Sequence, residues 1–323
     1  MTQPPPLTNE QKLELRELEP KLRRAARFGD FKSAKKISTE IQVLLRTTGH
    51  TTRLLQAKNW LYECALEAGE YSFAERGFIG TKKLASPATR LYLEATALLA
   101  ICYLRRNKLN LAKPLVAEAL DRVKNIKSDA KRRQFHSRFI NRLEEECVLA
   151  GLHSDSPIQL PVEEAQQLAI EFVTNNKSEG ELLIELGRSL PKESLHLAQE
   201  VREVFNRRLP APDRKALPPP ISEDSAEELG TRSKSALKRV VWRALCDPDS
   251  ELYKEWTQGV KAFYDKKVIM SALAASCVAA SLAPSAVVLG ALVALALRFG
   301  AALFCEKFQP SSLMIEKSDR NES

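Results

Sequence analysis

The stretch that decides the fold is residues 268–304, VIMSALAASCVAASLAPSAVVLGALVALALRFGAALF, in which the only charged residue is Arg298. About 20 apolar residues cross a bilayer core of about 30 Å, and thirty positions here precede the charge. Pro284 lies near the middle, where a proline removes a helical hydrogen bond and clashes with the preceding turn. We therefore predict a transmembrane helical hairpin over residues 268–305 that breaks at the proline. A single kinked span is the alternative.

Small residues dominate this stretch, because eighteen of its thirty-seven positions are Ala, Gly or Ser. Small side chains at a spacing of four let helix backbones approach closely, which is how helices associate in lipid. The residues expected to pack helices together are Ala272, Ser276, Ala280, Pro284 and Gly290. The stretch therefore predicts a lipid bilayer and a homo-oligomer as partners. The alternative is a hairpin buried inside a soluble oligomer.

Aromatic and cationic side chains flank the apolar stretch, a combination typical of a membrane interface. The expected interface residues are Trp242, Tyr253, Trp256, Phe263, Tyr264, Lys266, Lys267 and Arg298. We interpret residues 236–267 as amphipathic interfacial helices, with packing of these aromatics into a core as the alternative. Arg298 either reaches the lipid headgroups from a helix end or lines a pore.

Length and composition bound the rest of the chain. At 323 residues there is room for two or three modules. No alternation of apolar and polar residues predicts strands, so we expect an all-α protein. The net charge of +8 suits an anionic partner, either lipid headgroups or nucleic acid.

The six cysteines are scattered without paired spacing. This pattern predicts reduced thiols rather than a disulfide framework or a zinc site, and Cys305 is either lipidated or a buried thiol. Residues 1–11 contain three consecutive prolines and no apolar core, so we expect a disordered N-terminus and no secretory signal. We therefore expect a tail-anchored protein that is located at the membrane, with the bulk of its chain on the cytoplasmic side.

Three short motifs recur at intervals of 40 and 38 residues: GDF at 29–31, GEY at 69–71 and NKL at 107–109. An alanine stands three positions after each motif. Each motif predicts the end of one helix and the start of the next, so the repeating unit is a pair of helices joined by a turn.

The residues of these units resemble the tetratricopeptide repeat family. The positions that carry the resemblance are Gly69, Tyr71, Ala74, Ala100, Tyr103, Ala112 and Ala119. The resemblance implies a helical solenoid, which we assign to residues 12–151. It also implies that a protein or peptide is bound in the concave groove of stacked helix pairs.

Four further segments follow the repeats. The helix expected at 128–150 is basic at its start and acidic at Glu144–Glu146, which we interpret as a solvated face, with an anion-binding patch as the alternative. Residues 158–209 have apolar positions at helical spacing and predict a small helical module. Five prolines in residues 210–235 predict an extended linker. Residues 306–323 form a polar tail.

Catalytic motifs are missing from the sequence. No phosphate loop, dinucleotide-binding glycine pattern or zinc spacing is present, and the four histidines lie far apart. We therefore expect no enzyme, no cofactor and no metal site.

The expected function is that of a membrane-anchored helical-repeat adaptor that binds a protein partner in the cytosol. Residues 244–253, 298–300 and 304–306 resemble C-terminal hydrophobic modules of bacterial phage-defence proteins. That resemblance implies antiviral defence, by a hairpin that oligomerises or permeabilises a membrane. One alternative is a soluble repeat protein that binds nucleic acid, which we do not favour. Another is a scaffold with its hairpin buried in an oligomer.

Overall fold

The computed structural model describes residues 4–154, 156–220, 225–246, 253–254, 266–299, 305 and 313. These residues form helices and one isolated β-bridge, so the predicted all-α class is confirmed for them. They divide into two compact units. The N-terminal unit contains residues up to 102, residues 110–139 and Leu313, and the C-terminal unit contains residues 103–109 and 140–310.

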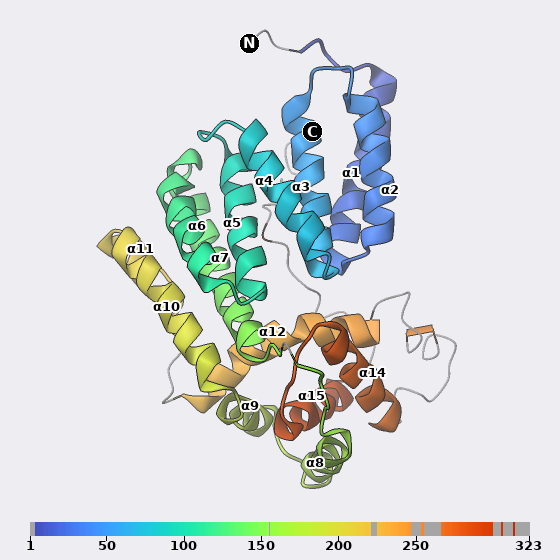
Figure 1. The fold of residues 1–323 in the computed structure, drawn as a ribbon, viewed down its shortest axis with the longest axis vertical. Helices are drawn as coiled ribbons and strands as arrows, with labels where there is room; N and C mark the ends of the chain where they lie inside the picture. The colour runs from blue at the N-terminus through green and yellow to red at the C-terminus, as the bar shows by residue number, and fades with distance from the viewer. Residues whose placement is uncertain are drawn as a thin grey trace. The chain divides into compact units, whose positions relative to one another are not determined.

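The N-terminal unit is a succession of antiparallel helices (Figure 1). Its helices are α1 (Asn9–Phe28), α2 (Phe31–Leu45), α3 (Thr51–Glu67), α4 (Tyr71–Leu84), α5 (Arg90–Arg105) and α6 (Leu109–Arg122), followed by the short η1 (Val123–Asn125) and the first part of α7 (Asp129–Gly151). The last residues of α5 and the second half of α7 belong to the C-terminal unit. Thr8 begins α1 by accepting a hydrogen bond from the amide of Gln11, whose side chain accepts one in return.

The turns inside the three helix pairs share one backbone geometry. Gly29, Gly69 and Asn107 have positive φ angles of 72°, 84° and 53°. In each turn the next amide donates to the carbonyl five residues earlier, from Asp30 to Ala25, from Glu70 to Ala65 and from Lys108 to Tyr103, over 3.0, 2.8 and 2.8 Å. This arrangement satisfies carbonyls that a helix end leaves unpaired. The predicted helix–turn–helix pairs are therefore confirmed.

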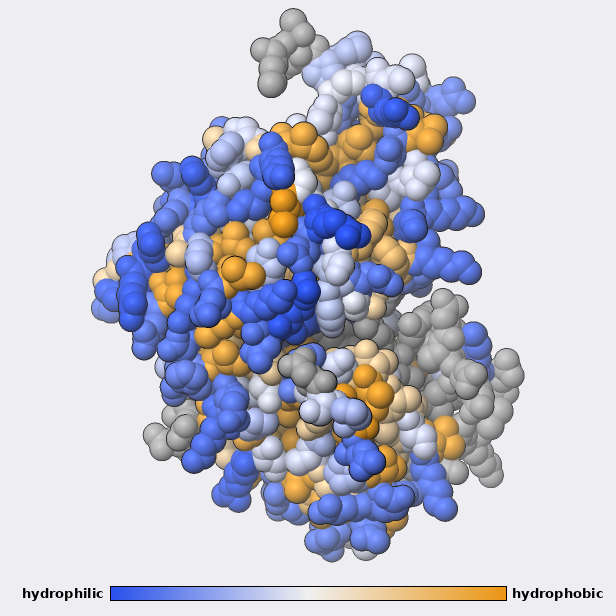
Figure 2. Space-filling model, viewed as in Figure 1, coloured by the Kyte–Doolittle hydropathy of each residue, from blue (hydrophilic) through white to orange (hydrophobic). Residues whose placement is uncertain are grey.

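Small residues in the N-terminal unit lie where helices cross. The alanines that follow the three turns, Ala34, Ala74 and Ala112, are all fully buried. At Gly77 a Cβ atom would lie 2.3 Å from the ring of Tyr62, so no larger residue fits there without displacing that ring. Large side chains such as Phe78 fill the remaining space. Large apolar side chains that stay exposed are scattered over several helices, and hydrophilic residues dominate the face shown in Figure 2.

The C-terminal unit packs its helices around the apolar stretch. Besides the end of α7 it contains α8 (Val162–Thr174), α9 (Glu179–Arg188), α10 (Lys192–Arg208), α11 (Ala211–Lys215), α12 (Ala226–Cys246), α14 (Lys266–Ala279) and α15 (Ala286–Phe299). Helix α15 packs mainly on α8 and also on α9, while α14 packs on α12 and α8 (Figure 1).

The apolar stretch forms two helices, and the predicted break at Pro284 is confirmed. The connection between α14 and α15 is held by hydrogen bonds from Ala283 to Leu152 and from Ser154 to Ser281. Each helix has 14 residues, or about 21 Å at 1.5 Å per residue. Among the described residues, no helix has both the length and the apolar character needed to span a bilayer.

Helices α9 and α12 approach each other closely because both carry glycine at their crossing. A Cβ on Gly230 would lie 1.8 Å from the carbonyl oxygen of Leu183, and one on Gly187 would lie 2.0 Å from that of Ala226. Residues 226–235, expected to belong to the linker, thus form the first half of α12. The prolines of that segment all precede residue 221, so the helix begins after them and buries Leu229 and Ser233.

Charged side chains lie buried in the second half of α7, where a solvated face was expected. Glu144, Glu146 and Arg142 are 1%, 0% and 7% exposed. Glu146 accepts a hydrogen bond from Arg105 Nε over 2.6 Å and pairs with Arg142 at 2.9 Å, while Glu144 pairs with Arg202 of α10. The prediction of a solvated face was wrong for this half of α7, because these charged side chains are buried. In the first half, Lys131 and Arg133 are exposed as expected.

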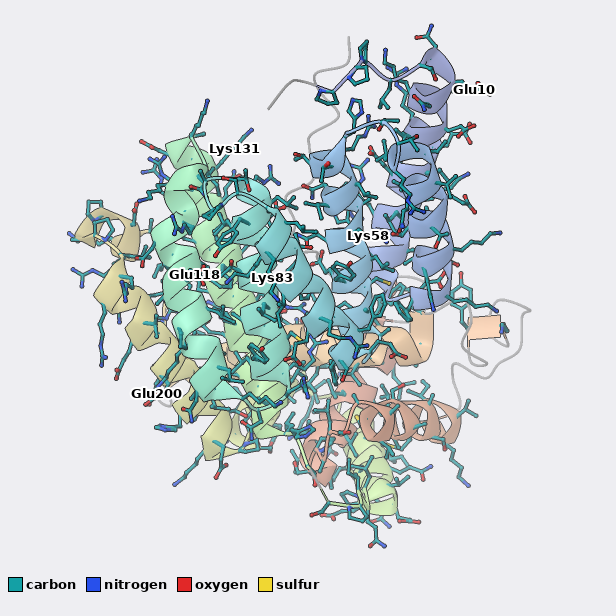
Figure 3. All side chains as sticks on the ribbon, turned by 45° about the horizontal axis from the view of Figure 1, so that its top comes forward. Glu10, Lys58, Lys83, Glu118, Lys131 and Glu200 are labelled. Carbon is teal, nitrogen blue, oxygen red and sulfur yellow. A yellow bond between two sulfur atoms is a disulfide. The ribbon has the colours of Figure 1, made fainter. Side chains whose placement is uncertain are left out.

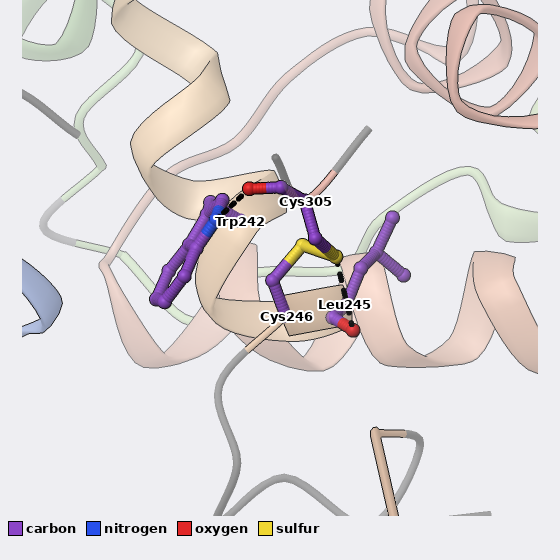
Figure 4. The surroundings of a disulfide bond; sticks show 4 residues. All are labelled: Trp242, Leu245, Cys246 and Cys305. Carbon is purple, nitrogen blue, oxygen red and sulfur yellow. Dashed lines mark hydrogen bonds between the residues drawn. A yellow bond between two sulfur atoms is a disulfide. The ribbon is translucent and has the colours of Figure 1, made fainter. Parts of the chain in front are cut away.

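A disulfide joins Cys246, at the end of α12, to Cys305 (Figure 4). The indole N–H of Trp242 donates to the carbonyl of Cys305 over 3.1 Å. The expectation of six reduced thiols was therefore wrong for this pair. A separation of 59 residues gives no spacing signal in the sequence, and only the fold brings the two together. The other four cysteines are buried free thiols.

We predict that changing Gly230 to Ala destabilises the C-terminal unit. The added methyl group has no room against the Leu183 carbonyl, and such overpacking costs about 1–3 kcal/mol. Gly80→Ala in α4 is the matched control, because nothing lies within 4 Å of its Cβ position. Alanine in a helix interior is favoured over glycine by about 0.5–1 kcal/mol, so the control gains stability. Urea unfolding followed by circular dichroism measures both, and a stabilised Gly230→Ala protein would contradict the close crossing.

The disulfide predicts a thiol count. Alkylation of the denatured chain labels four cysteines before reduction and six after it, as read by intact mass. Six labels without reductant, from protein purified with its thiols blocked, would contradict the pairing. In the chain-entropy account, closing a 59-residue loop stabilises the folded state by about 4 kcal/mol. Cys305→Ser should lower the free energy of unfolding by up to about that amount.

Candidate peptide-binding site on helix α3

Helix α3 carries a row of polar side chains on one side. Gln56, Asn59, Glu63 and Glu67 are spaced three or four residues apart, so they lie one above another on the helix. The last three are 0%, 4% and 8% exposed. Buried polar and charged groups are costly unless they are paired. The hydrogen-bond partners of these residues therefore determine what the row costs the fold.

Leu313 is bound to this row from the far end of the chain. The backbone amide of Leu313 donates to Glu63 Oε1 over 2.8 Å, and Leu313 is 4% exposed. A carboxylate that accepts a backbone amide recognises the main chain of an extended segment rather than a particular side chain. The apolar side chain is removed from water at the same place. Helix α3 thus holds a non-helical residue by its backbone and by its burial.

Asn59 lies one helical turn before Glu63 and has no hydrogen-bond partner. Both its side-chain nitrogen and its side-chain oxygen are buried and unsatisfied. Such a group costs about 1–3 kcal/mol, and native proteins contain few of them. A side-chain amide both donates and accepts, so it can pair with both polar groups of a peptide bond. Asn59 therefore has one donor group and one acceptor group that no other group in the described part of the protein uses.

Helix α5 adjoins the same polar row. Gln56 Nε2 donates to Glu94 Oε2 over 3.5 Å, which links α3 to α5. Glu94 is 1% exposed and pairs with Arg90 at 2.7 Å. The row on α3 and this carboxylate together make the site acidic. A segment bound here is expected to present amide N–H groups or cationic side chains.

A second polar cluster joins helices α4, α5 and α6. Glu118 of α6, labelled in Figure 3, accepts hydrogen bonds from Lys82 over 2.8 Å and from the hydroxyl of Tyr92 over 2.5 Å. Burial raises the pKa of Glu118, but these two hydrogen bonds and the charges of Lys82 and Arg122 outweigh it, so the net pKa is lowered. The hydrogen bond to Glu118 raises the pKa of Tyr92. The cluster braces the helix pairs and supplies no nucleophile.

The sequence predicted the repeat-structural residues as packing positions, and the structure places them at turns and crossings. Gly69 has the positive φ of its turn. Tyr71 and Tyr103 are half-buried. The remaining four are fully buried: Ala74, Ala100, Ala112 and Ala119. These residues do not line the α3 site, so the likeness to the repeat family did not indicate it.

The structure describes five of the eight residues predicted for a membrane interface. Trp242 is 4% exposed and bonded to Cys305, and Tyr253 is half-buried. Lys266 begins α14, Lys267 is exposed, and Arg298 is exposed near the end of α15, donating to the Lys177 carbonyl over 3.1 Å. Three more of the predicted set lie outside the described residues: Trp256, Phe263 and Tyr264.

The residues predicted for helix packing meet other parts of the C-terminal unit. Gly290 is buried, and a Cβ there would lie 3.0 Å from the Ala165 carbonyl of α8. Pro284 is buried, whereas Ala272, Ser276 and Ala280 are half-buried. The close approach that Gly290 allows is therefore an approach of α15 to α8.

The described residues offer little reactive chemistry. They contain no group of three or more His, Cys, Asp or Glu side chains that could hold a metal ion. Burial raises the pKa of the Cys277 thiol to about 12. Burial, with Glu144 and Glu146 nearby, also raises that of Cys147. Thiols of this kind are inert at neutral pH.

Comparison of the chain with protein-family models, with curated proteins and with solved structures finds no match. One signal for the α3 site was present in the sequence. Asn59, Glu63 and Glu67 recur at intervals of four on a helix in which most neighbouring positions are apolar or aromatic.

We predict that Asn59→Leu stabilises the N-terminal unit. The change removes a buried amide without partners and should raise the free energy of unfolding by about 1–3 kcal/mol. Gln56→Leu is the matched control, since that amide already bonds to Glu94, and it should give no gain. Thermal unfolding of the three full-length proteins compares them. A destabilised Asn59→Leu protein would show that the amide is satisfied in solution.

Proposed function

We propose that the chain is a helical-repeat adaptor whose N-terminal unit binds an extended protein segment along α3. The observation that carries the proposal is the capture of a backbone amide by the buried carboxylate of Glu63, one turn from the unpartnered amide of Asn59. These groups recognise main chain, and the burial of Leu313 marks a place for an apolar side chain.

The partner is a protein or peptide with an apolar residue in an otherwise polar or basic segment. Buried acidic groups on α3 and α5 favour cationic neighbours and disfavour phosphate. This argues against nucleic acid at the site. Among the basic residues of α7, Arg142 is paired with Glu146 and Arg132 with Asp129, while Lys131 and Arg133 stay exposed.

Membership of the tetratricopeptide repeat family is part of the same proposal. Three helix pairs joined by turns of one geometry support it, as do the buried alanines that follow each turn. In this account the pairs stack into a solenoid that presents α1, α3 and α5 to the partner.

A second proposal concerns the apolar stretch, which the sequence assigns to a membrane anchor or to a defence effector. Helices α8, α9 and α12 cover α14 and α15. Insertion into lipid, by an anchor or by an oligomerising hairpin, therefore requires these two helices to leave that packing. The support is the thirty-residue run without a charge and the exposure of Val278 on α14, at 48%. Carbonate-resistant association of the full-length chain with vesicles is the expected result. Complete recovery in the aqueous fraction would exclude this proposal.

Binding at α3 is tested by selecting a displayed random peptide library against the full-length chain and against its Leu313→Asp variant. Enriched peptides should carry a leucine or another large apolar residue. Their binding should fall at least about tenfold with Glu63→Gln, because about 1.4 kcal/mol is lost with a charge-assisted hydrogen bond. The matched control Glu10→Gln lies in the exposed first turn of α1. Failure to enrich peptides, or equal binding to the Glu63 variant, would rule the proposal out.

A further inference from the structure

The geometry points to occupation of the α3 site by the chain's own C-terminal segment at Leu313, which competes with the partner. This inference rests on the proposed function of that site. The two residues of the contact are 250 positions apart. Leu313 nevertheless belongs to the N-terminal unit together with α3. The occupant is therefore an internal ligand.

The sequence around Leu313 suits this role. Residues 306–323, EKFQPSSLMIEKSDRNES, form a mostly polar tail in which Leu313 opens the only run of three apolar residues. Outside this run, Phe308 is the only other large apolar residue of the tail. Burial of the leucine side chain favours the bound state, and the hydrogen bond from its amide to Glu63 is charge-assisted. These are the two contributions that an external peptide would make at the same place.

The internal ligand satisfies the site only in part. Glu63 receives the amide of Leu313, but the side chain of Asn59 remains without a partner on either of its polar atoms. A partner that pairs with both residues gains the hydrogen bonds that the internal segment leaves unmade. It therefore displaces Leu313 even though the internal segment is tethered to the chain. The unpaired amide of Asn59 thus gives a partner that bonds to it an advantage over the internal segment, which does not.

The consequence is autoinhibition. The apparent affinity for a partner is reduced by the fraction of molecules whose site is vacant, so vacating the site raises the affinity. Leu313→Asp achieves this, because a carboxylate placed beside Glu63 is repelled and its burial is costly. The change lies near the end of the chain, outside the described helices, and an unchanged melting temperature of α1–α6 checks that the unit stays folded.

The test uses a fluorescent peptide of residues 306–323 and the full-length protein. The peptide should bind the Leu313→Asp protein at least about tenfold more tightly than the wild type, measured by anisotropy. A peptide that itself carries Leu313→Asp is the matched control and should not bind. Glu63→Gln, added to the Leu313→Asp protein, should reduce the binding again.

The outcomes separate this inference from the proposed function. If the wild type and the Leu313→Asp protein bind the peptide equally, the internal segment does not occupy the site, and the inference is overturned. If library peptides bind in a Glu63-dependent manner but the tail peptide binds neither protein, the inference also fails while the proposed function stands. If no peptide of any kind binds, both this inference and the proposed function are contradicted.

Discussion

Removal of the apolar stretch from water is the constraint on which the C-terminal unit depends. Helix α15 buries Val288, Leu289 and Val293, and a helix that is apolar on most sides needs cover on most sides. Helices α8 and α9 supply it. Their cover in turn needs α12 to lie close to α9, which the facing glycines at 187 and 230 allow. One hydrophobic requirement thus accounts for the helix that begins at residue 226 and for the residues at its crossing.

Charges lie buried in α7 as ion pairs. Glu144 pairs with Arg202 of α10 and Arg232 of α12, and Glu146 pairs with Arg105 of α5 and with Arg142 of α7 itself. Burial raises the pKa of Glu144, and the charges of Arg202 and Arg232 only partly offset this. Buried ion pairs add little net stability, yet losing one partner costs about 3–5 kcal/mol. Arg202 also donates to the carbonyl of Pro218 over 2.8 Å, so the network fixes the course of the proline-rich segment. Its value lies in specifying one packing arrangement.

Local features of the fold could be predicted from the sequence, and long-range ones could not. The turns at Gly29, Gly69 and Asn107 depend on a few neighbouring residues, and so does the break at Pro284. The partner of α15 was not predictable, because lipid and a protein core both satisfy an apolar helix. Nothing in the sequence joins Cys246 to Cys305, or Leu313 to Glu63, since each pair meets only when distant segments are folded. The burial of Trp242 could not be predicted either, because it too depends on distant segments of the chain.

The polar row on α3 departs from the apolar pattern expected of a buried helix face. A helix face optimised for packing would carry apolar residues at 59, 63 and 67, and the sequence has Asn, Glu and Glu there. A search for apolar residues at helical spacing treats the polar residues at such positions as exceptions to the apolar face. In the structure Glu63 accepts the backbone amide of Leu313, whereas the side chain of Asn59 is buried without a partner, which costs stability. The spacing of these polar residues in the sequence shows that they share a helix face, but only the folded chain shows which of them are paired.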